Sequence, residues 1–98
     1  MLRGYDIDGV LTAGVQPIAP AVAISGRCFP GYDDFAKRIA QFFPVYIRGV
    51  GQADAVDAGK FKAMIINHLG VEEFYEDDDV QIKVIQDNCP RCKVIKVE

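Results

Sequence analysis

Residues Leu2–Thr12 have the sequence LRGYDIDGVLT, which contains two carboxylates, Asp6 and Asp8. Its first part, Leu2–Ile7, predicts a strand that is closed by the turn pair Asp8-Gly9. Asp6 and Asp8 are two residues apart, so in an extended chain their side chains project to the same side. Two neighbouring carboxylates repel each other, so one is expected to titrate normally while the other holds a proton more tightly. This division suits a nucleophile beside a general acid.

The remaining chain alternates predicted strands with predicted helices. Residues 9–20 contain two glycines and two prolines and are expected to form a loop or short flap, and glycines across 49–59 predict another loop. Further strands are expected at Ala21–Ile24, Val45–Ile47, Glu73–Tyr75 and Val94–Val97. Helices are expected from Asp33 to Pro44, from about Lys60 to Leu69 and from Val80 to Cys89. The alternation predicts a three-layer α/β/α sandwich with a mainly parallel, Rossmann-like sheet, in one domain over residues 1–98.

Apolar residues at helical spacing mark the helix faces that are expected to pack inward. They are Phe35, Ile39, Phe42 and Phe43 in the first helix, Phe61, Met64, Ile65 and Leu69 in the second, and Val80, Val84 and Ile85 in the third.

Oxygen-bearing side chains follow three of the predicted strands. Asp6 and Asp8 follow the first, Ser25 the second, and Glu76–Asp79 the fourth. Ligands of open α/β sheets bind beyond the carboxyl ends of the strands, so these side chains are expected to converge. Mg²⁺ prefers oxygen ligands, usually one or two carboxylates together with phosphate and water. The sequence therefore predicts a magnesium-assisted phosphoryl site, in which a serine hydroxyl and a lysine ammonium hold the remaining phosphoryl oxygens.

Plainer interpretations remain open for several of these residues. Asp8-Gly9 alone is ordinary turn chemistry. Residues 76–79 are also typical of a solvated loop in which Asp78 or Asp79 caps the next helix. His68, the single histidine, falls near a helix end where a cation is stabilised, so a structural role is expected for it.

The segment YDIDGVLT (Tyr5–Thr12) resembles the first motif of the haloacid dehalogenase (HAD) superfamily, a hydrophobic strand followed by DxDGxxT. AVAIS, which ends in Ser25, resembles the second motif, and the helix that begins near Lys60 and Lys62 resembles the third. FYEDD (Phe74–Asp78) resembles the acidic fourth motif. The resemblance runs from Leu2 to about Asp78 and covers most of the chain.

The resemblance implies a Mg²⁺-dependent phosphatase that acts through an aspartyl-phosphate. Asp6 would be the nucleophile and a metal ligand. Asp8 would protonate the leaving group, then activate water, and would lend its backbone carbonyl to the metal. Asp77 would complete the metal site, with Glu76 as the second candidate.

The resemblance also implies how the phosphoryl group would be held. Ser25 and the adjacent Gly26 would bind its oxygens, and one lysine would neutralise its charge. Lys62 is preferred because it lies one turn into the predicted helix, and Lys60 is the alternative.

The gaps between the motifs are short, so the resemblance is to a capless member with an open site. The run SGR (Ser25–Arg27) is similar to the phosphatase domains of polynucleotide end-repair enzymes. Polynucleotide 3′ ends therefore join nucleotides and small phosphomonoesters as candidate substrates, and Arg27, Phe29 and Tyr32 are candidates for contact with the leaving group. A non-catalytic phosphate- or metal-binding accessory module is the alternative from a different class, and a homo-oligomer that supplies a lid also remains open.

Composition limits the remaining possibilities. The 98 residues carry a net charge of −3, with lysines and arginines scattered, so a grip on long DNA or RNA is not favoured. The N-terminus has no signal-peptide pattern, and the longest mostly apolar run, Ile18–Ile24, is too short to cross a bilayer, so a cytoplasmic protein with no membrane partner is expected.

Cys89-Pro90-Arg91-Cys92 lacks the second ligand pair of a zinc site, so the three cysteines are expected to be reduced.

Overall fold

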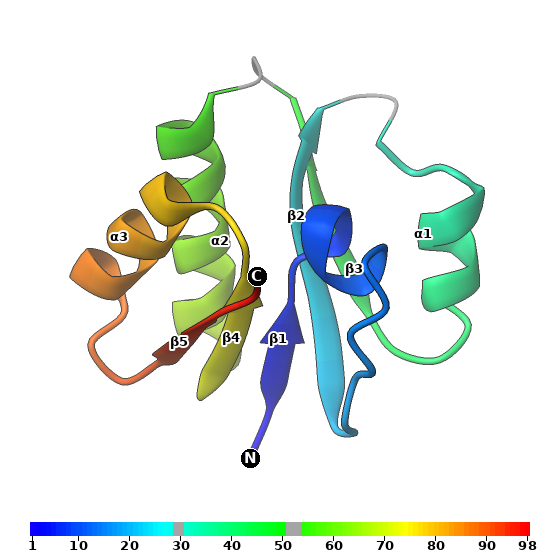
Figure 1. Cartoon of the computed structure of the whole chain (residues 1–98), viewed down its shortest axis with the longest axis horizontal. Helices are drawn as coiled ribbons and strands as arrows, with labels where there is room; N and C mark the ends of the chain where they lie inside the picture. The colour runs from blue at the N-terminus through cyan, green and yellow to red at the C-terminus, as the bar shows by residue number, and fades with distance from the viewer. Residues whose placement is uncertain (29–30, 51–53) are drawn as a thin grey trace.

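The computed structural model describes residues 1–28, 31–50 and 54–98, and these form an α/β fold around a five-stranded sheet (Figure 1). Its strands lie in the order β3-β2-β1-β4-β5, and every neighbouring pair is parallel. The elements are β1 (Arg3–Tyr5), η1 (Ile7–Leu11), β2 (Ala21–Cys28), α1 (Asp34–Ile39), β3 (Val45–Gly49), α2 (Ala55–Leu69), β4 (Glu73–Glu76), α3 (Asp79–Asn88) and β5 (Lys93–Lys96). The predicted alternation of strands and helices is confirmed, and none of the described helices is long and apolar enough to cross a bilayer.

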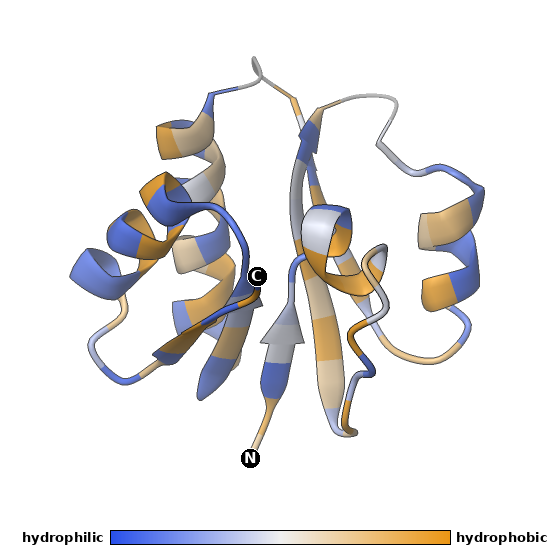
Figure 2. Ribbon diagram, viewed as in Figure 1, coloured by the Kyte–Doolittle hydropathy of each residue, from blue (hydrophilic) through white to orange (hydrophobic). Residues whose placement is uncertain are grey.

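Helices pack on both faces of the sheet, because alternate side chains of β2 point into two different cores. Val22 and Ile24 point into a core that contains residues of α2 and α3. Ala21 and Ala23 point into a second core, which contains residues of η1 and α1. In Figure 2, α1 is hydrophobic on the side toward the sheet and hydrophilic on its outer side. A strand that is buried on both faces is typically a continuous apolar run, as Ala21–Ile24 is.

The first strand is shorter than predicted, because the chain leaves the sheet at Asp6. The Asp6 carboxylate accepts a hydrogen bond from the backbone N–H of Ile7 (2.9 Å), and the N–H of Thr12 donates to the Ile7 carbonyl (3.1 Å). Ile7 is therefore the start of the helical turn η1 rather than the end of a strand. The expected loop over residues 9–20 begins inside this turn, which is irregular, since Asp8 and Gly9 within it have non-helical φ and ψ values.

The second helix begins earlier than predicted. It starts at Ala55, where the Asp54 carboxylate accepts hydrogen bonds from the N–H groups of Val56 (2.8 Å) and Asp57 (3.2 Å). Gly59 lies inside this helix. A Cβ at this position would come within 2.9 Å of the Val84 Cβ on α3. The glycine thus permits close packing of two helices and does not mark a loop, while residues 51–53 of the expected loop lie outside the described part of the chain.

Other boundaries differ by a few residues. β2 continues past Ile24 to Cys28 because it still pairs with β3, with a register shift between Ser25 and Cys28. The helix predicted from Asp33 to Pro44 is regular only over Asp34–Ile39. Three side chains that were expected to pack inward are exposed: Phe42, Met64 and Val80. The expected cap of the third helix is confirmed at Asp78, whose carboxylate accepts from the Gln81 N–H.

Candidate active site

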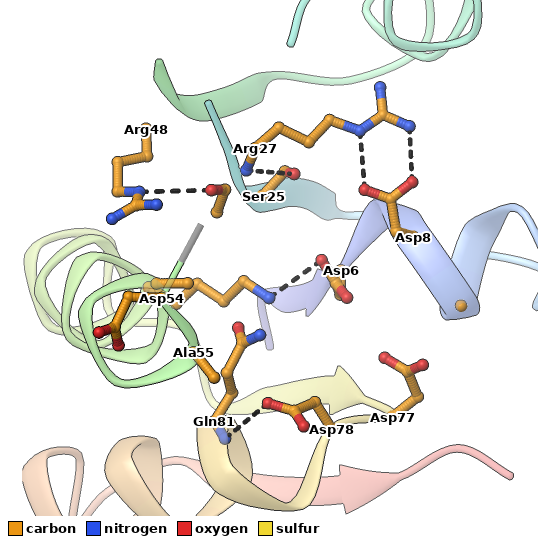
Figure 3. Close-up of a pocket in the computed structure, with 14 residues that line it drawn as sticks. Asp6, Asp8, Ser25, Arg27, Arg48, Asp54, Ala55, Asp77, Asp78 and Gln81 are labelled. Carbon is orange, nitrogen blue, oxygen red and sulfur yellow. Dashed lines mark hydrogen bonds and ion pairs between the residues drawn. The ribbon is translucent and has the colours of Figure 1, made fainter. Parts of the chain in front are cut away.

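The carboxyl ends of the parallel strands meet at one edge of the sheet, and a cavity of about 490 Å³ opens there (Figure 3). Its walls come from η1, β2, β3, α2 and α3, and from the residues that directly follow β1 and β4. Asp6, Asp8, Ser25, Lys62 and Asp77 all line this cavity. Residues far apart in the sequence therefore converge where the sequence predicted a ligand site.

Lys62 is the buried cation of this site. Its Nζ lies 3.0 Å from Oδ1 of Asp6 and 2.5 Å from Oε1 of Glu76. Asp6 follows β1 and Glu76 ends β4, and these strands are neighbours, so both carboxyl groups reach one ammonium. All three side chains are buried. Since a buried charge is tolerated only when it is paired, the three residues form one ionic unit, the Lys62 cluster.

Burial raises the pKa of both carboxyl groups in the Lys62 cluster. For Asp6, removal from water is the largest cause, and the nearby ammonium of Lys62 opposes it. For Glu76, burial is again the largest cause and raises the pKa to about 8, with Lys62 opposing and Asp6 adding to the shift. The spacing of Asp6 and Asp8 left open which of the two would have the raised pKa, and in the structure it is Asp6, together with Glu76 from β4.

Asp8 pairs instead with Arg27, toward which it turns in Figure 3. The Nε and Nη2 groups of Arg27 donate to the two carboxylate oxygens of Asp8, each at 2.8 Å. Nη1 of Arg27 reaches the Asp33 carboxylate at 2.9 Å. The hydrogen bonds from Arg27 are the largest cause that lowers the pKa of Asp8. Asp8 is thus held as a carboxylate, a state that suits a base and not an acid.

One group of acids in the described part of the chain is arranged to share a cation. Asp6, Glu76 and Asp77 each offer a carboxylate oxygen, and these oxygens lie within 4.8 Å of one another. Glu76 is already engaged, because Oε1 meets Lys62 and Oε2 accepts from the N–H groups of Asp77 (3.1 Å) and Asp78 (3.4 Å). Asp6 and Asp77 are then the better pair of ligands. Hard oxygen donors of this kind fit Mg²⁺, and the side chain of Asp8 is not among them.

Gly9 lets Asp77 approach the first motif. It has a φ of +80°, and a Cβ on it would overlap the carboxylate of Asp77. Its N–H donates to Oγ1 of Thr12 at 2.9 Å, which fixes the turn. The glycine and threonine of the first motif therefore have a local physical purpose, since they shape the backbone against which Asp77 rests.

Of the four residues expected to bind the phosphoryl group, Ser25, Gly26 and Lys62 line the cavity and Lys60 does not. Ser25 is buried at the cavity wall, and its Oγ accepts from the N–H of Arg27 at 3.1 Å. Gly26 lies beside it, where a Cβ would come within 2.5 Å of the Ala58 Cβ. Lys62 faces the cavity, whereas Lys60 is exposed and lines a different surface depression.

Two further polar residues of the cavity were missed in the sequence. Arg48 comes from β3, and Gln81 comes from the first turn of α3. Oε1 of Gln81 is buried without a hydrogen-bond partner among the described residues, which suits a bound group that donates a hydrogen bond. Arg48 was detectable in principle, because it stands at the end of the third predicted strand, on the same edge as the acids.

The other candidates lie apart from this cavity. His68 is exposed near the end of α2. Cys89 is buried, and burial raises the pKa of Cys92 to about 12. Tyr32 is exposed outside the cavity lining, and Phe29 lies outside the described residues. None of the cysteines belongs to a group of metal-ligating side chains within the described ranges.

Comparison with known proteins gives no match: no family model, no curated protein sequence and no solved structure is significantly similar to this chain. The assignment of function therefore rests on the motifs and on the geometry of the site.

Proposed function

We propose that this chain is a capless, HAD-type phosphomonoester hydrolase that forms an aspartyl-phosphate on Asp6. The observation that carries the proposal is the convergence of three groups in one cavity. A carboxylate at the end of a strand contacts a buried ammonium at 3.0 Å, and a second carboxylate is close enough to share a cation with it. A nucleophile that must approach an anion needs such neutralisation.

The reaction has two steps on the residues of this chain. A carboxylate oxygen of Asp6 attacks phosphorus, the bond from phosphorus to the ester oxygen breaks, and the departing oxygen takes a proton from Asp8. Water then attacks the phosphorus of the aspartyl-phosphate, Asp8 takes its proton, and the carboxylate of Asp6 is restored. Lys62 balances negative charge on the phosphoryl oxygens, and Ser25 donates a hydrogen bond to them.

Asp6 and Asp77 would hold the Mg²⁺, which supplies positive charge next to the phosphoryl oxygens. Arg27 adds a condition to the first step. Because Arg27 holds Asp8 as a carboxylate, Asp8 must first separate from the guanidinium and take a proton, from water or from a singly protonated phosphate of the substrate, before it can act as the acid. In the second step the carboxylate form is already the one required.

The test is phosphate release from a broad panel of phosphomonoesters in the presence of Mg²⁺. We expect turnover on at least one class of substrate, and no turnover by Asp6→Asn, because an amide is not a competent nucleophile. Normal rates in Asp6→Asn would rule out the covalent route.

The pairing of Asp8 with Arg27 is the observation that favours a second candidate, a module that binds phosphate and metal without catalysis. Its signature would be a rise in Tm with Mg²⁺ and phosphate while the whole panel remains unhydrolysed.

A further inference from the structure

Gln81 lines the active-site cavity, and its side-chain carbonyl lacks a hydrogen-bond donor. The Oε1 atom is buried and accepts no hydrogen bond from any residue that the structure describes. In Figure 3 the amide of Gln81 points away from α3 and into the cavity. Because a buried acceptor without a donor costs free energy, such an atom in a cavity wall indicates a ligand that supplies the donor.

The contacts of Glu76 explain why this carbonyl has no local partner. Asp78 caps α3 and Gln81 is the third residue of the helix, which is the spacing of a capping box. In that motif the side chain at the third position accepts a hydrogen bond from the N–H of the capping residue. Here the N–H of Asp78 donates to Oε2 of Glu76 at 3.4 Å. Glu76 thus takes the donor that would otherwise satisfy Gln81.

Gln81 packs beside the helix that carries Lys62. A Cβ on Gly59 would come within 3.4 Å of the Gln81 Cα, so the first turn of α3 lies against α2 at this point. Lys62 follows Gly59 by three residues and therefore lies on the same side of α2. Gln81 and Lys62 also line the same cavity, into which the phosphoryl group of the proposed reaction would enter.

The charged donors near Gln81 contact carboxylates. The Lys62 ammonium contacts Asp6 and Glu76, and it is not a partner of the Gln81 carbonyl. The Arg27 guanidinium contacts Asp8 and Asp33. The missing donor is therefore expected to arrive with the bound group.

The charge of the described cavity wall favours a bound anion that keeps a proton. Acidic side chains outnumber basic ones among its lining residues, and a bare dianion is repelled by carboxylates more strongly than a protonated anion is. The acids are Asp6, Asp8, Asp54, Asp77 and Asp78, and the bases are Arg27, Arg48 and Lys62.

We propose that Gln81 is a specificity residue of this site, whose carbonyl oxygen accepts a hydrogen bond from the protonated oxygen of a phosphoryl group. The inference rests on the phosphoryl site of the proposed function, although not on its chemical step. For a phosphomonoester, the form that the site selects is the monoanion. A group of the same shape without a proton, such as sulfate, leaves the carbonyl unsatisfied and binds less tightly.

The experiment compares inorganic phosphate with sulfate, which have nearly the same size and shape. At neutral pH phosphate keeps at least one proton, whereas sulfate keeps none. We expect the wild type to bind phosphate about tenfold or more tightly than sulfate, which is the size of effect that an unsatisfied buried acceptor produces. The Kd values come from Tm against anion concentration, at one Mg²⁺ concentration and one ionic strength.

Gln81→Met removes the carbonyl and keeps a long, flexible side chain. This variant should lose most of the preference for phosphate and keep a nearly unchanged Kd for sulfate. Without any anion, its Tm should exceed that of the wild type by about 4 °C or more, because a buried acceptor without a donor has been removed. Gln86→Met is the matched control, since Gln86 is exposed on the same helix, and it should change neither the preference nor the Tm.

Several results overturn the inference. One is a wild type that binds neither anion or binds both equally, and another is a Gln81→Met variant that keeps the preference. Equal loss of both anions in Gln81→Met would make the Gln81 amide a donor, and an unchanged Tm without anions would show that its carbonyl is already satisfied in the free protein.

Anion binding needs no turnover, so this inference and the proposed function fail separately. Hydrolysis of phosphomonoesters by a wild type that does not prefer phosphate to sulfate would overturn the inference alone. A preference for phosphate that depends on Gln81, in a protein that hydrolyses no phosphomonoester, would support the inference and overturn the proposed function.

Discussion

Lys62 Nζ lies 3.0 Å from Oδ1 of Asp6, so a cation carried by α2 contacts the carboxylate at the end of β1. The same ammonium reaches Glu76 at the end of β4. The early start of α2 at Ala55 and its close packing against α3 at Gly59 fix the position of this lysine. The stability of this edge of the sheet and the chemistry proposed for it therefore both depend on the side chain of Lys62.

Replacement of Lys62 by methionine should destabilise the fold strongly. Two buried carboxyl groups would lose their shared cation, at a cost to the free energy of unfolding of about 3 kcal/mol. Lys60→Met is the matched control, since Lys60 is exposed on the same helix and its loss should cost less than about 0.5 kcal/mol. Urea denaturation of both variants measures the difference, and equal costs would contradict the role given to Lys62.

Gly9→Ala should weaken Mg²⁺ binding as well as the fold. Gly9 and Gly14 both have positive φ values, +80° and +94°, so alanine at either position costs about 1 kcal/mol of backbone strain. A Cβ at Gly14 meets nothing within 4 Å, whereas at Gly9 it overlaps the carboxylate of Asp77. We expect the Mg²⁺-dependent rise in Tm to shrink in Gly9→Ala and to persist in Gly14→Ala. The same Mg²⁺ response in both variants would count against Asp77 as a ligand.

Asp77→Asn should lower the affinity for Mg²⁺, because an amide oxygen replaces a charged ligand in a site with two carboxylates. A loss of about tenfold or more in Kd is expected, measured from Tm against Mg²⁺ concentration. Asp79→Asn is the control, since Asp79 is exposed and pairs with Lys96 at 2.9 Å. An unchanged Mg²⁺ response in Asp77→Asn would place the cation elsewhere.

Without divalent ions, stability should fall as pH rises through the neutral range. The pKa of Glu76 is about 8 in the folded protein, because burial raises it from its ordinary value of 4.5. The folded state therefore binds more protons than the unfolded state between these values, so the free energy of unfolding decreases across this window. The raised pKa of Asp6 acts in the same direction.

Glu76→Gln, which resembles the protonated form, should flatten this dependence. Denaturation curves recorded in a chelator across the same window provide the measurement. A wild type whose stability increases with pH there would show that Glu76 is ionised in the folded state.

Much of the fold follows from local sequence signals. The strand at the apolar run Ala21–Ile24, the end of α2 at Leu69 and the cap at Asp78 were all predictable from the sequence, because each depends on residues close by in the chain. Gly59 and Ile7 were misjudged for the opposite reason. Their conformations depend on Val84 of α3 and on the turn that closes at Thr12, and no local propensity reports such contacts.

The sequence predicted which residues belong to the site, but not which of their side chains bond to each other. Strand ends identified Asp6, Ser25 and the acidic run after β4, since parallel strands bring their carboxyl ends to one edge. The bond between Asp8 and Arg27 was not predictable, because it depends on how far β2 continues past Ser25. The same extension, together with the full length of β3, brings Arg48 to the cavity.

The most direct test of the central claim is chemical trapping of the phosphorylated carboxylate. Brief incubation with a hydrolysed substrate and Mg²⁺, followed by borohydride reduction and peptide mass spectrometry, converts a phosphorylated aspartate to homoserine. The account predicts homoserine at position 6 and at no other aspartate, with no conversion when substrate is omitted. Turnover without conversion at position 6, or conversion at another aspartate, would contradict it.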